Sequence, residues 1–103
     1  MYSREAAIDL SKKFIQDCSN QGIEIERAIL FGSTAKDKHT ENSDIDIALV
    51  SKMFGTNFIL NNKMTSKINI KYPLIEVHHF NDEYYEKADP FIDEINKTGI
   101  IIN

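Results

Sequence analysis

The stretch Leu30-Phe31-Gly32-Ser33, followed after ten residues by Asp44-Ile45-Asp46-Ile47, decides the fold of this chain. The apolar run 28–31 predicts a central strand, buried on both faces, that stops at Gly32. Because glycine has no side chain, Gly32 permits unusual backbone angles and a close approach by a ligand. Ser33 should begin a short helix, where free backbone N–H groups favour an anion. The alternative is an ordinary strand-to-helix turn with Ser33 as its N-cap.

The Asp-x-Asp pair lies on the next expected strand, residues 44–51. Its spacing of two puts Asp44 and Asp46 on one face, about 7 Å apart along the backbone, with Ile45 and Ile47 on the other. Two like charges side by side on a strand are unfavourable, and Mg²⁺, which prefers hard oxygen ligands, would remove that repulsion. The alternative is a solvated strand face on which both aspartates point to water.

A third carboxylate, Glu76, is the only acid in the expected strand 74–80. It lies in an apolar setting, where an unpaired charge is costly. If this strand neighbours the second, Glu76 completes a three-carboxylate cluster that shares a metal or accepts a proton; the alternative is an exposed residue on a half-buried strand. His78 shares the face of Glu76 and so could line the site, although a histidine in contact with solvent at a strand end is the more frequent arrangement.

The rest of the chain supplies helices and a short tail. An amphipathic helix should start at Ser3 and close near residues 20–22, residues 54–72 have roughly helical spacing up to a proline, and two short helices are expected over residues 81–85 and 89–97. The apolar tail 100–102 should pack on the body or on another chain. This order predicts an α/β (α+β) fold with a small mixed β-sheet covered by helices.

The bulk properties indicate one domain, residues 1–103, with a modest core. A net charge of −4 argues against direct nucleic-acid binding, which favours a basic stripe. The single cysteine, Cys18, falls on a helical pattern and should be buried rather than reactive. Because no signal segment or membrane-length apolar run is evident, we expect a cytoplasmic protein.

At these motifs the sequence resembles the nucleotidyltransferase superfamily related to the palm domain of DNA polymerase beta. The signature of that superfamily is Gly-Ser at a strand end, a spacer, Asp-x-Asp on the next strand and a third carboxylate on a later strand. The resemblance is closest to the minimal nucleotidyltransferases, stand-alone chains often encoded beside a helical HEPN-family protein in a toxin–antitoxin pair. It covers nearly the whole chain and includes Leu30-Phe31, Ser43, Asp93-Glu94-Ile95 and Gly99-Ile100.

The resemblance implies a role for each motif residue. Asp44 and Asp46 would hold the metal ions, and Glu76 would be a third ligand or the base. Many minimal members carry aspartate at this third position, whereas glutamate resembles the residue used in aminoglycoside nucleotidyltransferases.

The same resemblance implies that Gly32 and Ser33 cradle the phosphates of the nucleoside triphosphate. Lys36 lies where the family often has a basic residue and would touch phosphate; a solvated loop lysine is an equally frequent alternative. Many relatives have a glycine where Asp37 and Lys38 stand here, so this loop departs from the family pattern.

The activity implied is Mg²⁺-dependent nucleotide transfer with two metal ions, using ATP or another nucleoside triphosphate. The acceptor would be a hydroxyl, by analogy a tyrosine of a HEPN-family toxin that is silenced by AMP. The main alternative is a catalytically inactive module of the same fold that neutralises its partner by contact. Under either function the chain could form a homo- or hetero-oligomer. Transfer to an aminoglycoside-like small molecule is less favoured, because those enzymes carry an additional domain.

Overall fold

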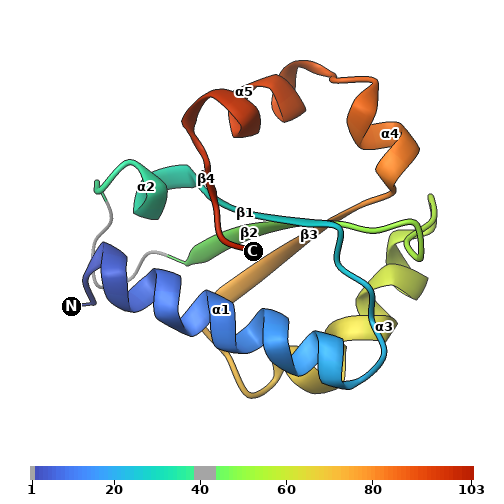
Figure 1. Ribbon diagram of the computed structural model, residues 1–103, viewed down its shortest axis with the longest axis horizontal. Helices are drawn as coiled ribbons and strands as arrows, with labels where there is room; N and C mark the ends of the chain where they lie inside the picture. Colours follow the sequence, from blue (N-terminus) through green and yellow to red (C-terminus); the bar gives the residue numbers. More distant parts are fainter. Residues whose placement is uncertain (1, 39–43) are drawn as a thin grey trace.

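The computed structural model describes residues 2–38 and 44–103, and Figure 1 shows its arrangement. The elements in chain order are α1 (Arg4–Asn20), β1 (Arg27–Phe31), α2 (Gly32–Ala35), β2 (Ile45–Val50), α3 (Phe58–Asn69), β3 (Ile75–Phe80), α4 (Asp82–Glu86), α5 (Pro90–Thr98) and β4 (Ile100–Ile101). This order confirms the expected α/β fold with a small mixed sheet.

The strands form one sheet in the order β3-β2-β1-β4. β1 is antiparallel to both β2 and β4, whereas β2 and β3 are parallel and are joined by the crossover helix α3. In this register Asp46 is the partner of Phe31 on one side and of Glu76 on the other. The Asp-x-Asp strand therefore lies in the interior of the sheet, directly beside the strand that carries Glu76.

Helices cover both faces of the sheet, with α1 and α3 on one side and α4 and α5 on the other (Figure 1). The core on the α1 and α3 side includes Phe14, Leu30 and Ile47, all fully buried. On the other face, Phe80 of β3 packs against Tyr85 of α4. Since β2 is apolar on both faces, as a buried central strand must be, the one acidic side chain within it stands out.

Local sequence signals set the helix ends. The Ser3 hydroxyl accepts a hydrogen bond of 3.0 Å from the Ala6 N–H, as expected for an N-cap, and Gly22 takes a φ of +83° just beyond α1. The start of α3 differs from the expected range because the Asn57 side chain caps it, accepting from the backbone of Ile59 and Leu60. The preceding residues form a loop instead of the first turn.

The C-terminal tail forms a strand that the sequence pattern did not predict. Ile100 and Ile101 pair with β1, and the next residue, Ile102, is buried to 5% exposure. Asn103 then accepts a hydrogen bond of 2.8 Å from the Ala28 N–H. The expectation that the tail packs on the body is confirmed, and the tail also extends the sheet at the edge of β1.

The single cysteine is buried, as its place in a helical pattern predicted. Cys18 is fully buried, and desolvation by burial, followed by the charge of Asp17, raises its pKa to about 11.

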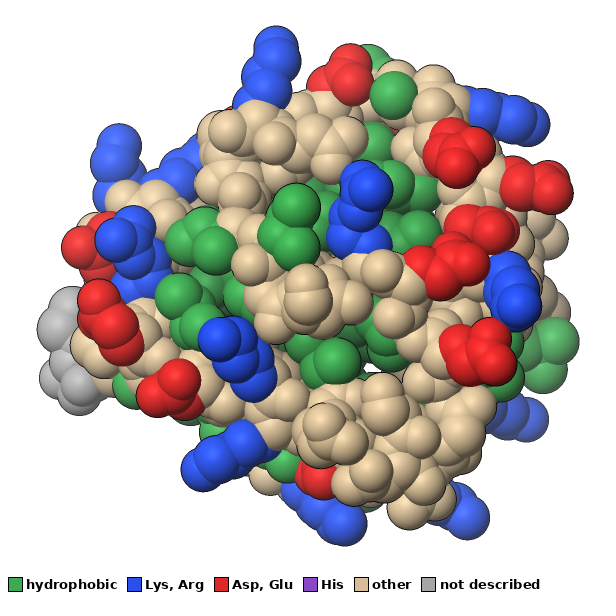
Figure 2. Space-filling model, in the orientation of Figure 1, with side chains coloured by type: hydrophobic (Ala, Val, Ile, Leu, Met, Phe, Trp, Pro, Cys, Tyr) green, Lys and Arg blue, Asp and Glu red, His purple; other side chains and the backbone are tan. Residues whose placement is uncertain are grey.

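Acidic side chains gather around α4, at the upper right of Figure 2. Across the part of the chain that the structure describes, none of the helices is both long enough and apolar enough to cross a membrane.

Candidate active site on two parallel strands

Asp46 of β2 and Glu76 and His78 of β3 form one cluster on the α5 side of the sheet. The parallel register pairs Asp46 with Glu76, and His78 follows two residues later on the same face. One ligand atom from each of the three lies within 4.8 Å of the others. Glu76 is exposed, while Asp46 and His78 are half-buried. Two carboxylates and an imidazole nitrogen form a donor set that fits a divalent metal ion.

His78 lines this cluster. The sequence had favoured a histidine that only contacts solvent at a strand end, and the structure corrects that expectation. Its Nε2 lies 3.3 Å from Oδ1 of Asp46, and its side chain is 30% exposed. The ring meets Phe31 edge-on, with ring centroids 5.0 Å apart, and Phe91 at 6.1 Å. These two aromatic rings limit the orientations open to the imidazole and direct Nε2 toward the carboxylate.

Gly32 lies against the other oxygen of Asp46. Its φ is +75°, and a Cβ built on its backbone would stand 2.6 Å from Oδ2 of Asp46. A side chain at this position would therefore force the Asp46 carboxylate to shift, because real Cβ atoms essentially never come this close to another heavy atom. In the structure the space beside Gly32 is taken by the carboxylate of Asp46, which lies between Gly32 and His78.

The predicted short helix after Gly32 is present as α2. Its N-cap is Phe31, so Ser33 is not the cap residue, and among the described residues the Ser33 hydroxyl has no hydrogen-bond partner. Thr34 is buried and donates a hydrogen bond of 3.4 Å from its hydroxyl to the Asp44 carbonyl. This contact ties α2 to the start of β2.

Asp44 stands apart from the cluster. It is exposed and precedes the first residue of β2, and it is not among the three residues whose ligand atoms converge. The structure therefore brings Asp46 and Glu76 together, adds His78, and leaves Asp44 exposed just before the first residue of β2.

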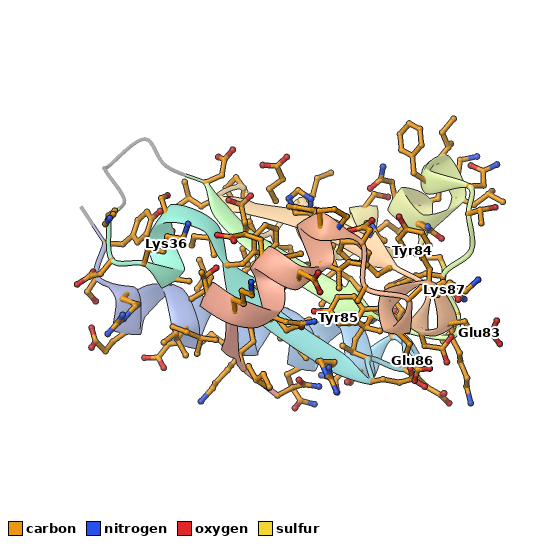
Figure 3. The ribbon with its side chains drawn as sticks, turned by 90° about the horizontal axis from the view of Figure 1, so that it is seen from above. Lys36, Glu83, Tyr84, Tyr85, Glu86 and Lys87 are labelled. Carbon is orange, nitrogen blue, oxygen red and sulfur yellow. The ribbon has the colours of Figure 1, made fainter. Side chains whose placement is uncertain are left out.

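Lys36 is engaged in an exposed ion pair. Its Nζ lies 3.4 Å from Oε1 of Glu94, with side chains 43% and 57% exposed. Exposed pairs of this kind contribute little to stability and exchange readily. Figure 3 shows Lys36 beside α2, well away from α4 with Tyr84 and Tyr85.

The two tyrosines of α4 behave differently from each other. Tyr85 is buried against Phe80, and its hydroxyl donates to Asn96 at 2.6 Å. Tyr84 is 49% exposed and donates to Asp89 at 2.5 Å, and this hydrogen bond raises the pKa of Tyr84.

The loop that departs from the family pattern has an unusual backbone. Asp37 has a φ of +58°, in the left-handed region where glycine is favoured. Aspartate tolerates that region better than most residues. Asp37 therefore adopts the left-handed backbone conformation that glycine adopts most easily.

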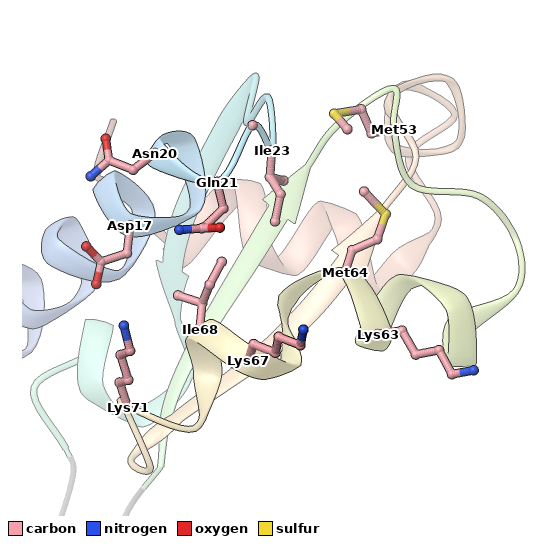
Figure 4. Close-up of a pocket in the computed structure, with 11 residues that line it drawn as sticks. Asp17, Asn20, Gln21, Ile23, Met53, Lys63, Met64, Lys67, Ile68 and Lys71 are labelled. Atoms are coloured by element: carbon pink, nitrogen blue, oxygen red, sulfur yellow. The ribbon is translucent and has the colours of Figure 1, made fainter.

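A pocket lies on the other face of the sheet. It has a volume of about 580 Å³, lies between the end of α1 and α3, and contains three lysines of α3 and its following turn, Lys63, Lys67 and Lys71 (Figure 4). None of the site residues expected from the sequence lines it. It belongs to the α1 and α3 layer, whereas the Asp46 cluster faces α5.

Comparisons with known proteins agree with the fold and motifs. The family described as "Polymerase beta, Nucleotidyltransferase" matches residues 12–103. A protein of Methanocaldococcus jannaschii named "Putative protein adenylyltransferase" is 30% identical over 100 residues, covering 90% of this chain and 95% of its own length. A crystal structure described as "a putative nucleotidyltransferase from Sulfolobus solfataricus" superposes with a TM-score of 0.67 at 17% identity, covering 95% of this chain and 80% of that one.

The structural likeness to the Sulfolobus protein shows a shared fold, and the family match spans nearly the whole chain. The Gly32-Ser33 turn and the Asp44-Ile45-Asp46 segment both fall within the matched residues. On these grounds the chain belongs to the polymerase beta family of nucleotidyltransferases.

Proposed function

We propose that this nucleotidyltransferase transfers AMP from ATP to a tyrosine hydroxyl of a HEPN-family partner protein, and thereby acts as an antitoxin. The observation that carries the proposal is the pairing of Asp46 with Glu76 on adjacent parallel strands, within a cluster whose ligand atoms lie within 4.8 Å. The name of the Methanocaldococcus relative supports AMP as the group transferred and a protein as the acceptor. The HEPN partner rests on the resemblance to the minimal nucleotidyltransferases.

The carboxylates have complementary tasks in this proposal. Asp46 and Glu76, with the exposed Asp44 just before β2, would hold two Mg²⁺ ions, which would supply positive charge to neutralise the triphosphate and the leaving pyrophosphate. The acceptor oxygen forms a bond to the α-phosphorus, and the bond from that phosphorus to the bridging oxygen breaks. Glu76, which is exposed, takes the proton of the acceptor hydroxyl.

The turn after β1 supplies the phosphate contacts. Gly32 and Ser33 offer backbone N–H groups at the start of α2, and the Ser33 hydroxyl adds a further donor for a phosphate oxygen. Lys36 reaches phosphate by leaving Glu94, which costs little because that ion pair is exposed.

The test is transfer of label from α-³²P-ATP, with Mg²⁺, to the HEPN-type protein encoded beside this chain. The wild type should label a tyrosine of that protein, and Asp46→Asn should abolish labelling without changing the circular dichroism spectrum. Asp9→Asn is the matched control, since Asp9 is an exposed aspartate of α1 outside the cluster. Near-normal turnover by Asp46→Asn would show that the mechanism is wrong.

A catalytically inactive module that neutralises its partner by contact is the second candidate. Two observations favour it: Asp44 lies outside the cluster of ligand atoms, and Lys36 is paired with Glu94. A stable complex between the two proteins, unaffected by Asp46→Asn and free of label, would establish this candidate and overturn the first.

A further inference from the structure

We propose that His78 is a direct metal ligand, so that the site binds a first-row transition metal ion more tightly than Mg²⁺. The proposal rests on the metal site of the proposed function and goes beyond it, because three carboxylates alone would give an all-oxygen site. It adds one residue, with a nitrogen donor, to the ligands implied by the sequence motifs.

The positions of the donor atoms carry the proposal. Nε2 of His78 lies 3.3 Å from Oδ1 of Asp46, and one ligand atom each from Asp46, Glu76 and His78 lies within 4.8 Å of the others. For bond lengths of about 2.1 Å, adjacent donors of an octahedral ion are about 3 Å apart and opposite donors about 4 Å. The imidazole nitrogen and the carboxylate oxygen are therefore already spaced as neighbouring ligands of one ion.

The surroundings fix this arrangement before any ion binds. The imidazole packs edge-on against Phe31, with ring centroids 5.0 Å apart, and is flanked by Phe91. The Asp46 carboxylate is restrained on its other side by the backbone of Gly32. Ligands that are held in place by packing lose less conformational freedom when a metal binds.

The donor set determines which ion is preferred. Mg²⁺ is a hard ion that takes oxygen ligands and keeps several waters, so an imidazole nitrogen gives it little advantage. First-row transition ions bind imidazole well, and their affinity for nitrogen and oxygen sites rises from Mn²⁺ to Co²⁺. Replacing the nitrogen donor should therefore weaken binding most for Co²⁺, less for Mn²⁺ and least for Mg²⁺.

The experiment measures metal affinity directly on the purified chain without nucleotide. The electron paramagnetic resonance signal of free Mn²⁺ gives its dissociation constant, and Co²⁺ and Mg²⁺ are measured by competition with Mn²⁺. His78→Gln places an amide near the position of Nε2, which preserves a hydrogen bond to Asp46 while removing the imidazole. His78→Phe preserves the ring between Phe31 and Phe91 and removes both the ligand and the hydrogen bond.

We expect His78→Gln to weaken Co²⁺ binding by about tenfold or more and Mg²⁺ binding by less than about threefold. His79→Gln is the matched control, because His79 is the next residue of β3 but its side chain contacts Thr65 of α3 on the opposite face. That variant should leave all three affinities unchanged.

The proposal would be overturned if His78→Gln lost the same affinity for all three ions, or lost affinity for none of them. An equal loss of affinity would show that His78 only positions Asp46. A thermal melt of each variant verifies that the chain is folded. The readout is independent of nucleotide transfer. Absence of label with every metal, together with a normal metal preference, would reject the proposed function and leave the role of His78 intact.

Discussion

Gly32 and Asp46 touch across the β1–β2 pair, with the backbone of the glycine filling the space beside one carboxylate oxygen. The contact follows from the register, because Phe31 is the partner of Asp46 and Gly32 is the first residue beyond it. A Cβ at Gly32 would stand 2.6 Å from Oδ2 of Asp46. The Gly-Ser turn and the Asp-x-Asp segment, which are separate in sequence, are therefore in direct contact in the fold.

Gly32→Ala should destabilise the chain by about 2 kcal/mol, because alanine is strained at positive φ and its methyl group meets the Asp46 carboxylate. Urea denaturation measures the change, and Mn²⁺ affinity should fall in the same variant because the carboxylate must move. Gly55→Ala is the control, since a Cβ there meets no atom within 4 Å. Equal stability of the two variants would show that the Gly32 contact is unimportant.

The two neighbouring isoleucines of the C-terminal tail should differ sharply in their effect on stability. Ile102 is 5% exposed in the core, whereas Ile101 is 65% exposed. Ile102→Ala should lower the free energy of unfolding by about 2–4 kcal/mol, and Ile101→Ala by less than about 0.5 kcal/mol. Chemical denaturation of the pair tests this, and similar losses at both positions would contradict the burial described for the tail.

His79 should make the chain less stable as the solution becomes acidic. Burial, with a smaller effect of the nearby His78, lowers the pKa of His79 from 6.5 to about 4. Above pH 6.5 the residue is neutral in both states, but between 6.5 and 4 the unfolded chain binds a proton that the folded chain does not. The free energy of unfolding should fall within this window by up to about 1.4 kcal/mol per pH unit.

Urea denaturation at several pH values within that window measures this slope. His79→Gln removes the titrating group and should flatten the pH dependence relative to the wild type. The same pH dependence is measured for His78→Gln as a comparison, because His78 lies on the other face of β3. An unchanged slope in His79→Gln would assign the pH dependence to other groups.

Asp37→Gly should stabilise the chain by about 0.5–1 kcal/mol, because Asp37 has a φ of +58° that costs a residue with a Cβ more than it costs glycine. The gain is reduced by the greater flexibility of glycine in the unfolded chain. A thermal melt compares this variant with Lys38→Gly, which changes the neighbouring residue, for which no positive φ occurs. A loss of stability in Asp37→Gly would mean that the aspartate side chain itself supports the loop.

Lys36 can be tested for a phosphate contact by comparing the two halves of its ion pair. Lys36→Ala should raise the KM for ATP several-fold if the lysine reaches phosphate, with little effect on stability because the pair is exposed. Glu94→Gln breaks the same ion pair and frees the lysine, so the KM should be unchanged or lower. Equal KM values in both variants and the wild type would show that Lys36 makes only the ion pair with Glu94 and does not contact phosphate.

The sequence was sufficient to predict the parts of the fold that depend on local pattern. The apolar run before Gly32 gave β1, and the alternation around Asp46 gave β2, because a buried strand and a turn have strong local signals. The cap at Ser3 likewise marked the start of α1. The tail strand was missed, because two residues have no usable periodicity and their pairing with β1 is set by tertiary contact.

The candidate site was predicted only in part for a related reason. The pairing of Asp46 with Glu76 required only that two predicted strands be neighbours. The place of His78 depends also on the parallel register and on Phe91, which comes from α5, so its local pattern could not distinguish a site residue from a solvent-exposed one. The Glu-x-His spacing, which puts both side chains on one face, was the signal that made His78 a candidate.

The adjacent histidines of β3 also constrain how this chain can change in length. His78 faces Asp46 and His79 faces Thr65 of α3, so the two imidazoles are separated only by the alternation of a strand. A single-residue insertion or deletion that moved β3 by one position against β2 would exchange them. Length variation in the connection 70–74 is therefore tolerable only where it leaves the phase of β3 unchanged, a rule that loop grafting and circular permutation of this fold must respect.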